Sequence, residues 1–498
     1  MMTTYQEWKQ RAENLLLDGR AFIGGQRCPA ASNETFQTLN PSTGKVLAGI
    51  AKCESKDIDR AVVAARDAFE SGVWSKAAPA ERKAALLRLA QLIEENAEEL
   101  ALLETLEAGK PISECMGLDI PESAACIRWH AELTDKRYDA LSPSGASVVS
   151  MITREPIGVV GAVLPWNFPA LMLAWKIGPA LSVGNSVIVK PAEQTSLSTL
   201  RIADLALQAG VPAGVFSVVT GFGESAGEAL GRHADVDLLA FTGSTETGKR
   251  FLHYSADTNL KRVVLECGGK NPQVVLPDVA NLDAVAEQAV AAAFWNMGEN
   301  CSAGSRILVP SATKARLLEK VQAVLEGWKT GDPLDPEVKL GSLIEEKHYE
   351  KVLAHIEKAK SEGARLVCGG KATRTGTGGW FVEPTIFDNV TPEMSIAREE
   401  VFGPVVCFIE YADVDEAVRI AHDTCYGLAA SLWTDNVNHA HKIAARIRAG
   451  TVTVNCFGEG DLSTPFGGFK QSGFGGRDKS VYAHDQYCEL KTTWLKLD

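Results

Sequence analysis

The stretch Leu238–Phe251, LLAFTGSTETGKRF, runs from an apolar segment through a glycine into a polar, helix-like segment. Gly243 and Gly248 are followed by Lys249, almost as in a phosphate-binding P-loop. A P-loop requires Ser or Thr after the lysine to coordinate Mg²⁺, and this chain has Arg250 there. A strand-to-helix turn still suits a phosphate, because backbone N–H groups at a helix N-terminus attract anions. The stretch therefore predicts a βα unit with an anion-binding turn, and an NTPase is the weakest interpretation.

Similar units precede this stretch. Short β-branched runs at 157–165, 185–191 and 216–221 alternate with amphipathic, helix-like runs at 196–210 and 224–233. This alternation predicts a doubly wound α/β domain with buried parallel strands. Ligands of such sheets bind at the carboxyl ends of the strands, where Lys190 and Gly243 are expected.

A second set of elements follows Gly268. It contains a helix-like run at 283–298 and strand-like runs at 306–310, 429–434 and 451–455, which indicate a second α/β domain. The cleft between the two domains is the expected ligand site. The segment 142–153 and the C-terminal tail alternate polar and apolar residues, which predicts strands contributed to an oligomer.

Composition narrows the class of protein. The 498 residues are 45% hydrophobic, which predicts two or more domains. A net charge of −13 argues against nucleic acid as a partner. The charged N-terminal segment has no signal-peptide pattern, and the most apolar stretch, 168–184, is too short to span a membrane, so we expect a cytoplasmic protein. The 11 cysteines include no CxxC pair, so neither a disulfide framework nor a metal site is expected.

Two stretches carry residue types suited to chemistry. FWNMGENCSAGSR places Cys301 just after a helix pattern, and VVLECGGKNP places Glu266 at the end of a strand before paired glycines. Each residue alone is ambiguous, because a free cysteine is usually a small buried hydrophobe and a strand-end glutamate is usually a solvated charge. PWNFP at 165–169 could likewise be only a turn bracketed by prolines.

Taken together, these stretches resemble the aldehyde dehydrogenase family. The motifs occur in family order along nearly the whole chain: NPSTG, ETLEAGKP, PWNFP, AWKIGPALSVGNSVIVKPAE, FTGSTETGK, LECGGKNP, FWNMGENCSAGSR, EEVFGPV, YGLAASLWT and PFGGFKQSG. The ending GRDKS…ELK is most similar to bacterial γ-glutamyl-γ-aminobutyraldehyde and guanidinobutyraldehyde dehydrogenases. The resemblance implies a Rossmann-like NAD-binding domain (1–137 and 157–266), an α/β catalytic domain (267–468) and a small β oligomerisation element (138–156 and 482–498). It further implies a homodimer or homotetramer.

The resemblance also implies the chemistry. Cys301 would attack a small-molecule aldehyde to give a thiohemiacetal, whose oxyanion the Asn167 amide and the Cys301 backbone N–H would stabilise. After hydride transfer, Glu266 would activate the water that hydrolyses the thioester. Lys176 matches a proton-relay position, and a lysine that merely extends from a core helix is an equally good interpretation.

The family's cofactor positions can be followed on this chain. The dinucleotide pyrophosphate would approach Gly243 and Ser244 at a helix N-terminus. The resemblance places the remaining cofactor contacts at Trp166, Lys190, Glu193, Glu400 and Phe402. Because a carboxylate at Glu193 would repel a 2′-phosphate, NAD is expected in preference to NADP.

Substrate residues are less clear. The resemblance places Trp175 and Trp295 in the substrate tunnel, and the acidic loop with Glu459 and Asp461, together with Asp119 or Glu122, could hold a cationic aldehyde tail. Solvated loop charges are a nearly equal alternative.

Two departures from the family pattern stand out. Glu299 replaces the usual glutamine and could raise the pKa of Cys301. An extra glycine before Arg477 leaves the relay position after it, Asp478, in doubt.

Two other functions stay open. A CoA-acylating semialdehyde dehydrogenase of the same fold would use CoA in place of water, but such enzymes typically lack the glutamate found here as Glu266. A non-catalytic protein of this fold would not need Asn167, Glu266 and Cys301 together.

Overall fold

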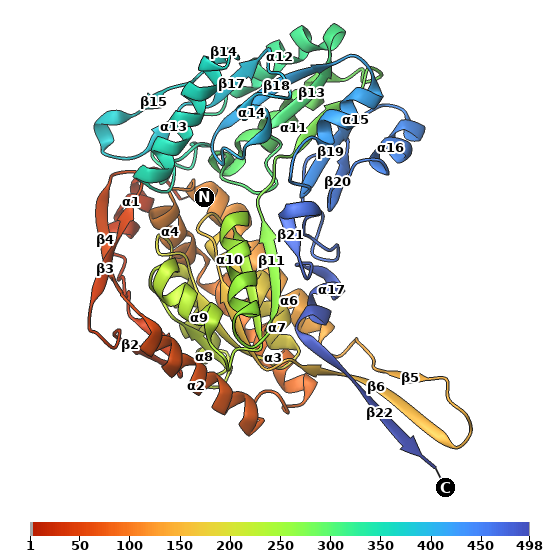
Figure 1. Cartoon of the computed structure of the whole chain (residues 1–498). Coiled ribbons are helices and arrows are strands. Elements are labelled where there is room, and N and C mark those ends of the chain that lie inside the picture. The colour runs from red at the N-terminus through yellow and green to blue at the C-terminus, as the bar shows by residue number, and fades with distance from the viewer. Residues whose placement is uncertain (1–2, 498) are drawn as a thin grey trace.

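The structure is a computed structural model that describes residues 3–497. It contains two large mixed sheets, each covered by helices, and a three-stranded arm that projects from the body (Figure 1). The α/β class predicted from the sequence is confirmed. Among the described residues, no helix has both the length and the apolar character needed to cross a membrane.

The first sheet has a parallel centre. From one edge to the other its strands are β2 (Gln26–Cys28), β1 (Ala21–Ile23), β9 (Phe216–Val218), β8 (Ser186–Lys190), β7 (Val159–Val163), β10 (Leu238–Gly243), β11 (Arg262–Cys267) and β21 (Gly473–Phe474). The strand order reverses direction between β7 and β10. Such a switch point opens a crevice at the carboxyl ends of the strands, where ligands bind.

Helices pack on both faces of this sheet because alternate strand residues point to opposite sides. Val160, Val187 and Ala240 join one core with α3 (Pro79–Glu95), α4 (Ala97–Ala108), α6 (Ile120–Leu133), α7 (Pro169–Ser182) and α8 (Leu197–Gln208). Ile188 and Phe241 join the other core with α2 (Ser55–Ser71), α9 (Glu228–Arg232) and α10 (Thr245–Ala256). The sheet is thus buried on both faces, as its apolar strands predict.

The second sheet lies after β11 in the chain. Its strands, in spatial order, are β14 (Arg365–Cys368), β17 (Thr385–Asp388), β18 (Val405–Tyr411), β13 (Arg306–Pro310), β12 (Pro272–Val275), β19 (Ala429–Trp433) and β20 (Thr451–Val454). Its helices are α11 (Leu282–Phe294), α12 (Ser311–Leu325), α13 (Glu346–Ser361), α14 (Ser395–Arg398), α15 (Val414–His422) and α16 (Val437–Ala444). Only β14 is antiparallel to its neighbour. The chain leaves the first sheet after Cys267 and returns to it at β21, so both crossings lie beside the space between the two sheets.

The arm consists of β5 (Ala140–Ser142), β6 (Val148–Pro156) and β22 (Cys488–Lys496). It extends away from both large sheets, with the C-terminus near its tip (Figure 1). Leu141, Leu490 and Trp494 are exposed on it. The remaining elements are α1 (Tyr5–Glu13), α5 (Ile112–Glu114), α17 (Ser480–Gln486) and the short pairs β3 (Thr35–Asn40) with β4 (Lys45–Ala51) and β15 (Ala372–Thr373) with β16 (Phe381–Val382).

Candidate active site

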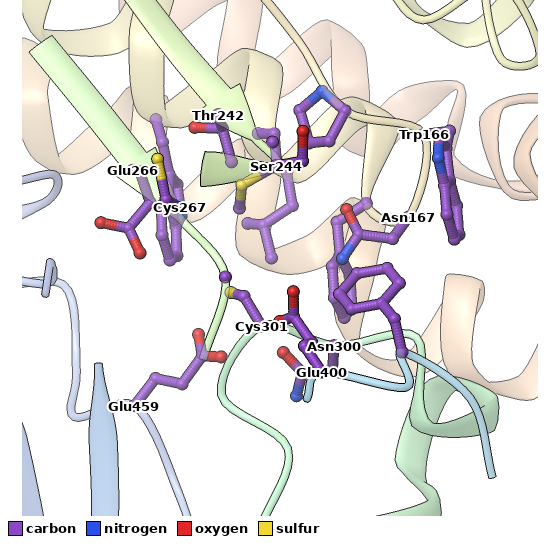
Figure 2. A pocket seen from close by; sticks show the side chains of 18 of the residues that line it. Trp166, Asn167, Thr242, Ser244, Glu266, Cys267, Asn300, Cys301, Glu400 and Glu459 are labelled. Carbon is purple, nitrogen blue, oxygen red and sulfur yellow. The ribbon is translucent and has the colours of Figure 1, made fainter. Parts of the chain in front are cut away.

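One cavity collects segments from the carboxyl ends of the first sheet and from the second half of the chain. Figure 2 shows Cys301 near its middle, with Glu266 and Glu459 on one side and Asn167 on the other. The segment after β7 supplies Trp166 and Asn167, which reach the cavity at the switch point of the first sheet. Asn167 and Cys301 lie more than a hundred positions apart in the sequence, and the topology brings them to one cavity.

The backbone before Cys301 is strained. After α11 ends, Asn296 (φ 51°), Met297 (φ 56°) and Gly298 (φ 69°) are all left-handed, a region that disfavours residues other than glycine. A side chain at Gly298 would lie 2.2 Å from the carbonyl oxygen of Gly403. The strained turn redirects the chain so that Cys301 enters the cavity, and the glycine is required for space as well as for conformation.

The surroundings of the Cys301 thiol disfavour its thiolate form. Burial raises its pKa well above the ordinary value, and the carboxylates of Glu459, Glu266 and Glu400 raise it further. The expected influence of Glu299 is absent from these causes. Its Oε1 accepts a hydrogen bond from the backbone N–H of Ile344 (3.1 Å) and lies 3.5 Å from His348 Nε2, so the carboxyl is engaged elsewhere. Glu299 is thus not one of the main groups that raise the pKa of Cys301, and an effect of Glu299 on this thiol stays a prediction.

Asn167 lies between β7 and α7 and is buried. Its Nδ2 donates to the carbonyl of Glu299 (2.9 Å), which fixes the amide. An amide nitrogen carries two hydrogens, so one donor is left to point at an oxyanion. The backbone carbonyl of Asn167 accepts hydrogen bonds from Lys110 Nζ and Asn296 Nδ2, each at 3.2 Å. The turn is thus anchored from two other elements.

Glu266 occupies the end of β11, and its side chain is buried. Burial raises its pKa well above the ordinary value, Asp478 and Glu459 add to the rise, and Lys176 and Arg477 oppose it. Its Oε1 has no hydrogen-bond partner among the described residues. A raised pKa and an uncommitted oxygen are the properties required of a general base that acts near neutral pH.

Lys176 and Asp478 form a buried ion pair next to Glu266. The Nζ to Oδ2 distance is 2.6 Å, and both side chains are almost fully inaccessible. The doubt about Asp478 arose from the extra glycine before Arg477, yet the structure brings this carboxylate into contact with Lys176. The sequence signal that could have found it is the acidic residue directly after Arg477.

Five cofactor candidates line the cavity, namely Trp166, Gly243, Ser244, Glu400 and Phe402, whereas Lys190 and Glu193 are not part of its wall. Ser244 caps α10 by accepting from the Thr247 N–H, so the helix N-terminus faces the crevice with Gly243. Lys190 Nζ pairs with Glu193 (2.8 Å), and this carboxylate is partly exposed. The Trp166 and Phe402 rings meet edge to face at 5.3 Å. Glu400 accepts from the Gly269 N–H (2.8 Å), and burial raises its pKa to about 7.

An adjoining outer cavity leads away from Cys301. Trp175, Trp295 and Glu459 belong to the walls of both the inner and the outer cavity. The outer wall also contains Glu114, Glu122, Lys339 and Lys479. The carboxyl of Glu114 accepts from Trp295 Nε1 (2.5 Å) and so orients this ring.

Two acidic residues expected at the substrate site lie elsewhere. Asp119 is fully buried and pairs with Lys110 (2.5 Å), beside Glu104 and Cys115. The ammonium of Lys110 thus supplies the positive charge of this acidic cluster. The cluster stabilises the turn that contains Asn167 and does not lie at the mouth of the substrate tunnel. Asp461 is exposed and accepts from the backbone and hydroxyl of Ser463 (2.8 and 2.6 Å). Asp461 therefore stabilises its own turn.

Lys479 is the outer-cavity residue that sequence analysis did not single out. Its side chain is 2% exposed, and Nζ lies over the rings of Trp175 (5.3 Å) and Phe466 (5.5 Å). Nζ also donates to the carbonyl of Glu459 (2.9 Å). Its backbone, at φ 59° and ψ 179°, is in a region that is essentially restricted to glycine. No feature of the sequence around Lys479 predicted that this ammonium would cover the aromatic wall.

The chain is similar to known proteins along nearly its whole length. The model of the aldehyde dehydrogenase family matches residues 28–493. The chain is 57% identical over 490 residues to an aminoacetaldehyde dehydrogenase of Pseudomonas aeruginosa, covering 98% of both chains. It is 46% identical to the NADP/NAD-dependent aldehyde dehydrogenase PuuC of Escherichia coli, covering 99% of this chain and 98% of the other. A solved indole-3-acetaldehyde dehydrogenase in complex with NAD⁺ superposes with a TM-score of 0.99 at 51% identity, covering 100% of both chains.

Proposed function

Because the chain belongs to the aldehyde dehydrogenase family and is an NAD(P)-dependent aldehyde dehydrogenase, we propose that it oxidises a cationic aldehyde through Cys301. The substrate class is a butyraldehyde whose tail carries a cationic group: an ω-amino or guanidino butyraldehyde, or a γ-glutamylamino butyraldehyde, whose α-ammonium is accompanied by an α-carboxylate. The observation that carries the mechanism is the convergence of Cys301, Asn167 and Glu266 on one cavity.

In the first step the Cys301 sulfur, as thiolate, adds to the aldehyde carbon and forms a thiohemiacetal. The negative charge moves to the carbonyl oxygen. The free N–H of the Asn167 amide and the backbone N–H of Cys301 stabilise this oxyanion, and one such donor contributes about 3–4 kcal/mol in comparable sites. Glu266 accepts the thiol proton.

Collapse of the oxyanion expels the aldehyde hydrogen as hydride and leaves an acyl group on Cys301. NAD, when bound, supplies the hydride acceptor. The N-terminus of α10, with Ser244, would hold the pyrophosphate of NAD. Lys190 and Glu193 would hold the adenine ribose. Glu400 and Phe402 would hold the nicotinamide end. Trp166 packs against Phe402 and supports this end of the crevice. The partly exposed Glu193 carboxylate supports NAD over NADP.

Deacylation regenerates the enzyme. Glu266 removes a proton from water, the water oxygen adds to the acyl carbon, and the C–S bond breaks to release the carboxylate and Cys301. Lys176 and Asp478 lie behind Glu266 as the path by which the proton leaves. The retained base supports hydrolysis over transfer to CoA.

The outer cavity supports a cationic tail, since Glu459 and Glu122 lie among aromatic rings there. Similarity to an aminoacetaldehyde dehydrogenase is in keeping with an amino aldehyde. We further propose that the first sheet is the cofactor domain, that the second is the catalytic domain, and that the arm with exposed Leu490 and Trp494 assembles a homodimer or homotetramer.

The test is NADH formation, followed at 340 nm, across aldehydes of equal length with cationic, neutral and anionic ends. We expect the highest kcat/KM for the cationic aldehydes, no requirement for CoA, and a lower kcat/KM with NADP⁺. Equal kcat/KM for butyraldehyde and 4-aminobutyraldehyde would overturn the substrate proposal, and turnover that requires CoA would overturn the hydrolytic mechanism.

A further inference from the structure

Glu459 links the substrate cavity to the nucleophile. Glu459 lines the inner cavity, which Figure 2 shows, and it is also part of the wall of the outer cavity. Its Oε1 accepts a 2.5 Å hydrogen bond from the hydroxyl of Ser302, the residue directly after Cys301. A carboxylate has two oxygens with about four acceptor sites, so Glu459 can bind a second donor from the outer cavity.

The protein's own cation does not pair directly with this carboxylate. Lys479 Nζ donates to the backbone carbonyls of Glu459 (2.9 Å) and Gly460 (3.4 Å). Within the described residues, no ammonium or guanidinium lies within 4 Å of the Glu459 carboxylate. The other charged groups that influence Glu459 or Cys301 are the carboxylates of Glu122, Glu266 and Glu400. Burial raises the pKa of Glu459 and the nearby Lys479 ammonium lowers it, but among the described residues no cation forms an ion pair with this carboxylate beside the thiol.

We propose that a cationic aldehyde activates its own nucleophile, because its positive end pairs with Glu459 and cancels a negative charge that disfavours the Cys301 thiolate. The substrate cavity and the reactive sulfur are then coupled through one carboxylate. An uncharged aldehyde fills the same space but leaves this charge in place. The enzyme selects its substrate by making the thiolate as well as by binding the tail.

Several observations support this coupling. Glu459 is the first of the charged neighbours that raise the pKa of Cys301, and the direction of the effect is that of a like charge. Pairing the carboxylate with an ammonium cancels this contribution. The coupling rests on the proposed function, since it requires a cationic substrate and Cys301 as nucleophile.

The experiment measures the thiol itself and needs no turnover. The NAD⁺-loaded enzyme is alkylated with iodoacetamide between pH 6 and 10, and modification of the Cys301 peptide is followed by mass spectrometry, because Cys425 and Cys456 are also exposed. The probes are 4-amino-1-butanol and 1-butanol, which match in length and cannot be oxidised through an aldehyde. With the amino alcohol we expect the midpoint of the pH profile to fall by about one unit relative to the alcohol.

Two variants complete the design. Glu459→Gln keeps the shape of the side chain, so its midpoint should already be lower without a probe and should not respond to the amine. Asp461→Asn removes an exposed carboxylate two positions further along the same loop and should behave as the wild type. The wild-type comparison of the two probes stands alone if Glu459→Gln does not fold.

An unchanged midpoint with the amino alcohol would overturn the proposal, whether or not the amine binds, because binding at Glu459 is part of it. An equal shift of the midpoint with 1-butanol would also overturn the proposal. Such a shift would come from the removal of water around the thiol by any bound alcohol, and not from the positive charge of the amine. Neither result would affect the proposed function, which depends on NADH formation from aldehydes. A normal shift without NADH formation from any aldehyde would reject the proposed function, and the shift would then show only that Glu459 controls the ionisation of the Cys301 thiol.

Discussion

The inner wall around Cys301 and the outer cavity beyond Trp175 differ in how their polar groups are held. In the inner wall, Asn167 and Glu400 are fixed by hydrogen bonds to backbone groups, and the chain before Cys301 is locked in a strained turn. The outer cavity holds three carboxylates and two lysines beside tryptophan rings. The inner wall therefore defines one reaction geometry. In the outer cavity, the ratio of carboxylates to lysines sets the preference for the charge of a substrate, and one substitution can change that ratio.

If this comparison is right, the largest effect comes from the inner wall. Cys301→Ala removes the thiol that lies near the middle of the cavity, between Glu266 and Asn167, so aldehyde oxidation should fall by at least about 10³-fold (Figure 2). NADH formation measures the loss. The matched control is Cys456→Ser, which changes an exposed cysteine close to Glu459 and should retain activity. Substantial turnover by Cys301→Ala would show that another group is the nucleophile.

Glu266→Gln should have the next largest effect. The variant should release a first burst of NADH and then turn over about 10²–10⁴-fold more slowly, because acylation proceeds but the deacylating water has no base. Rapid mixing separates the two phases.

The pH dependence supplies a second check. The base works only when deprotonated, and its pKa is raised, so steady-state turnover of the wild type should increase with pH through that raised pKa. The variant should lack this dependence. A variant with unchanged steady-state turnover would contradict the role assigned to Glu266.

The same division between the two regions explains what the sequence could and could not predict. The strands ending at Lys190 and Gly243 follow from apolar patterning, because buried parallel strands read as continuous apolar runs. Cys301 and Glu266 were found because several long motifs occur together in family order.

The outer residues could not be predicted in this way, since their positions depend on loop geometry. Asp119 and Asp461 are acidic residues near the correct segments, but one is paired inside the core and the other caps a turn. Lys479 follows an inserted glycine and has a backbone conformation that no propensity predicts. The direction in which a charged side chain points depends on its tertiary contacts. The residues next to it in the sequence do not determine that direction.

A smaller effect is expected first on the free energy of unfolding, and it tests whether the buried ion pair keeps the inner wall rigid. Asp478→Ala leaves the Lys176 ammonium buried without its partner, which typically costs about 3–5 kcal/mol. The thermal unfolding midpoint should fall. The double variant Lys176→Met with Asp478→Leu should recover much of that midpoint, because an apolar pair removes the buried charge.

Activity then separates structure from proton transfer. If the ion pair carries the proton, the stable double variant should still deacylate slowly, and its turnover should respond differently to pH. A double variant with both a normal midpoint and a normal pH profile would show that the pair has only a structural role.

The smallest expected effect concerns the balance of charge in the outer cavity. Lys479 already places an ammonium over Trp175 and Phe466, the faces that a cationic tail would otherwise use. Lys479→Met retains the bulk of the side chain and removes the repulsion, so KM for 4-aminobutyraldehyde should fall by about fivefold, which corresponds to roughly 1 kcal/mol. KM for butyraldehyde should change little, because the uncharged tail experiences no repulsion. Loss of the hydrogen bond to the Glu459 carbonyl would loosen the loop and change both KM values alike, and that result would identify Lys479 as a support of the loop rather than a determinant of charge preference.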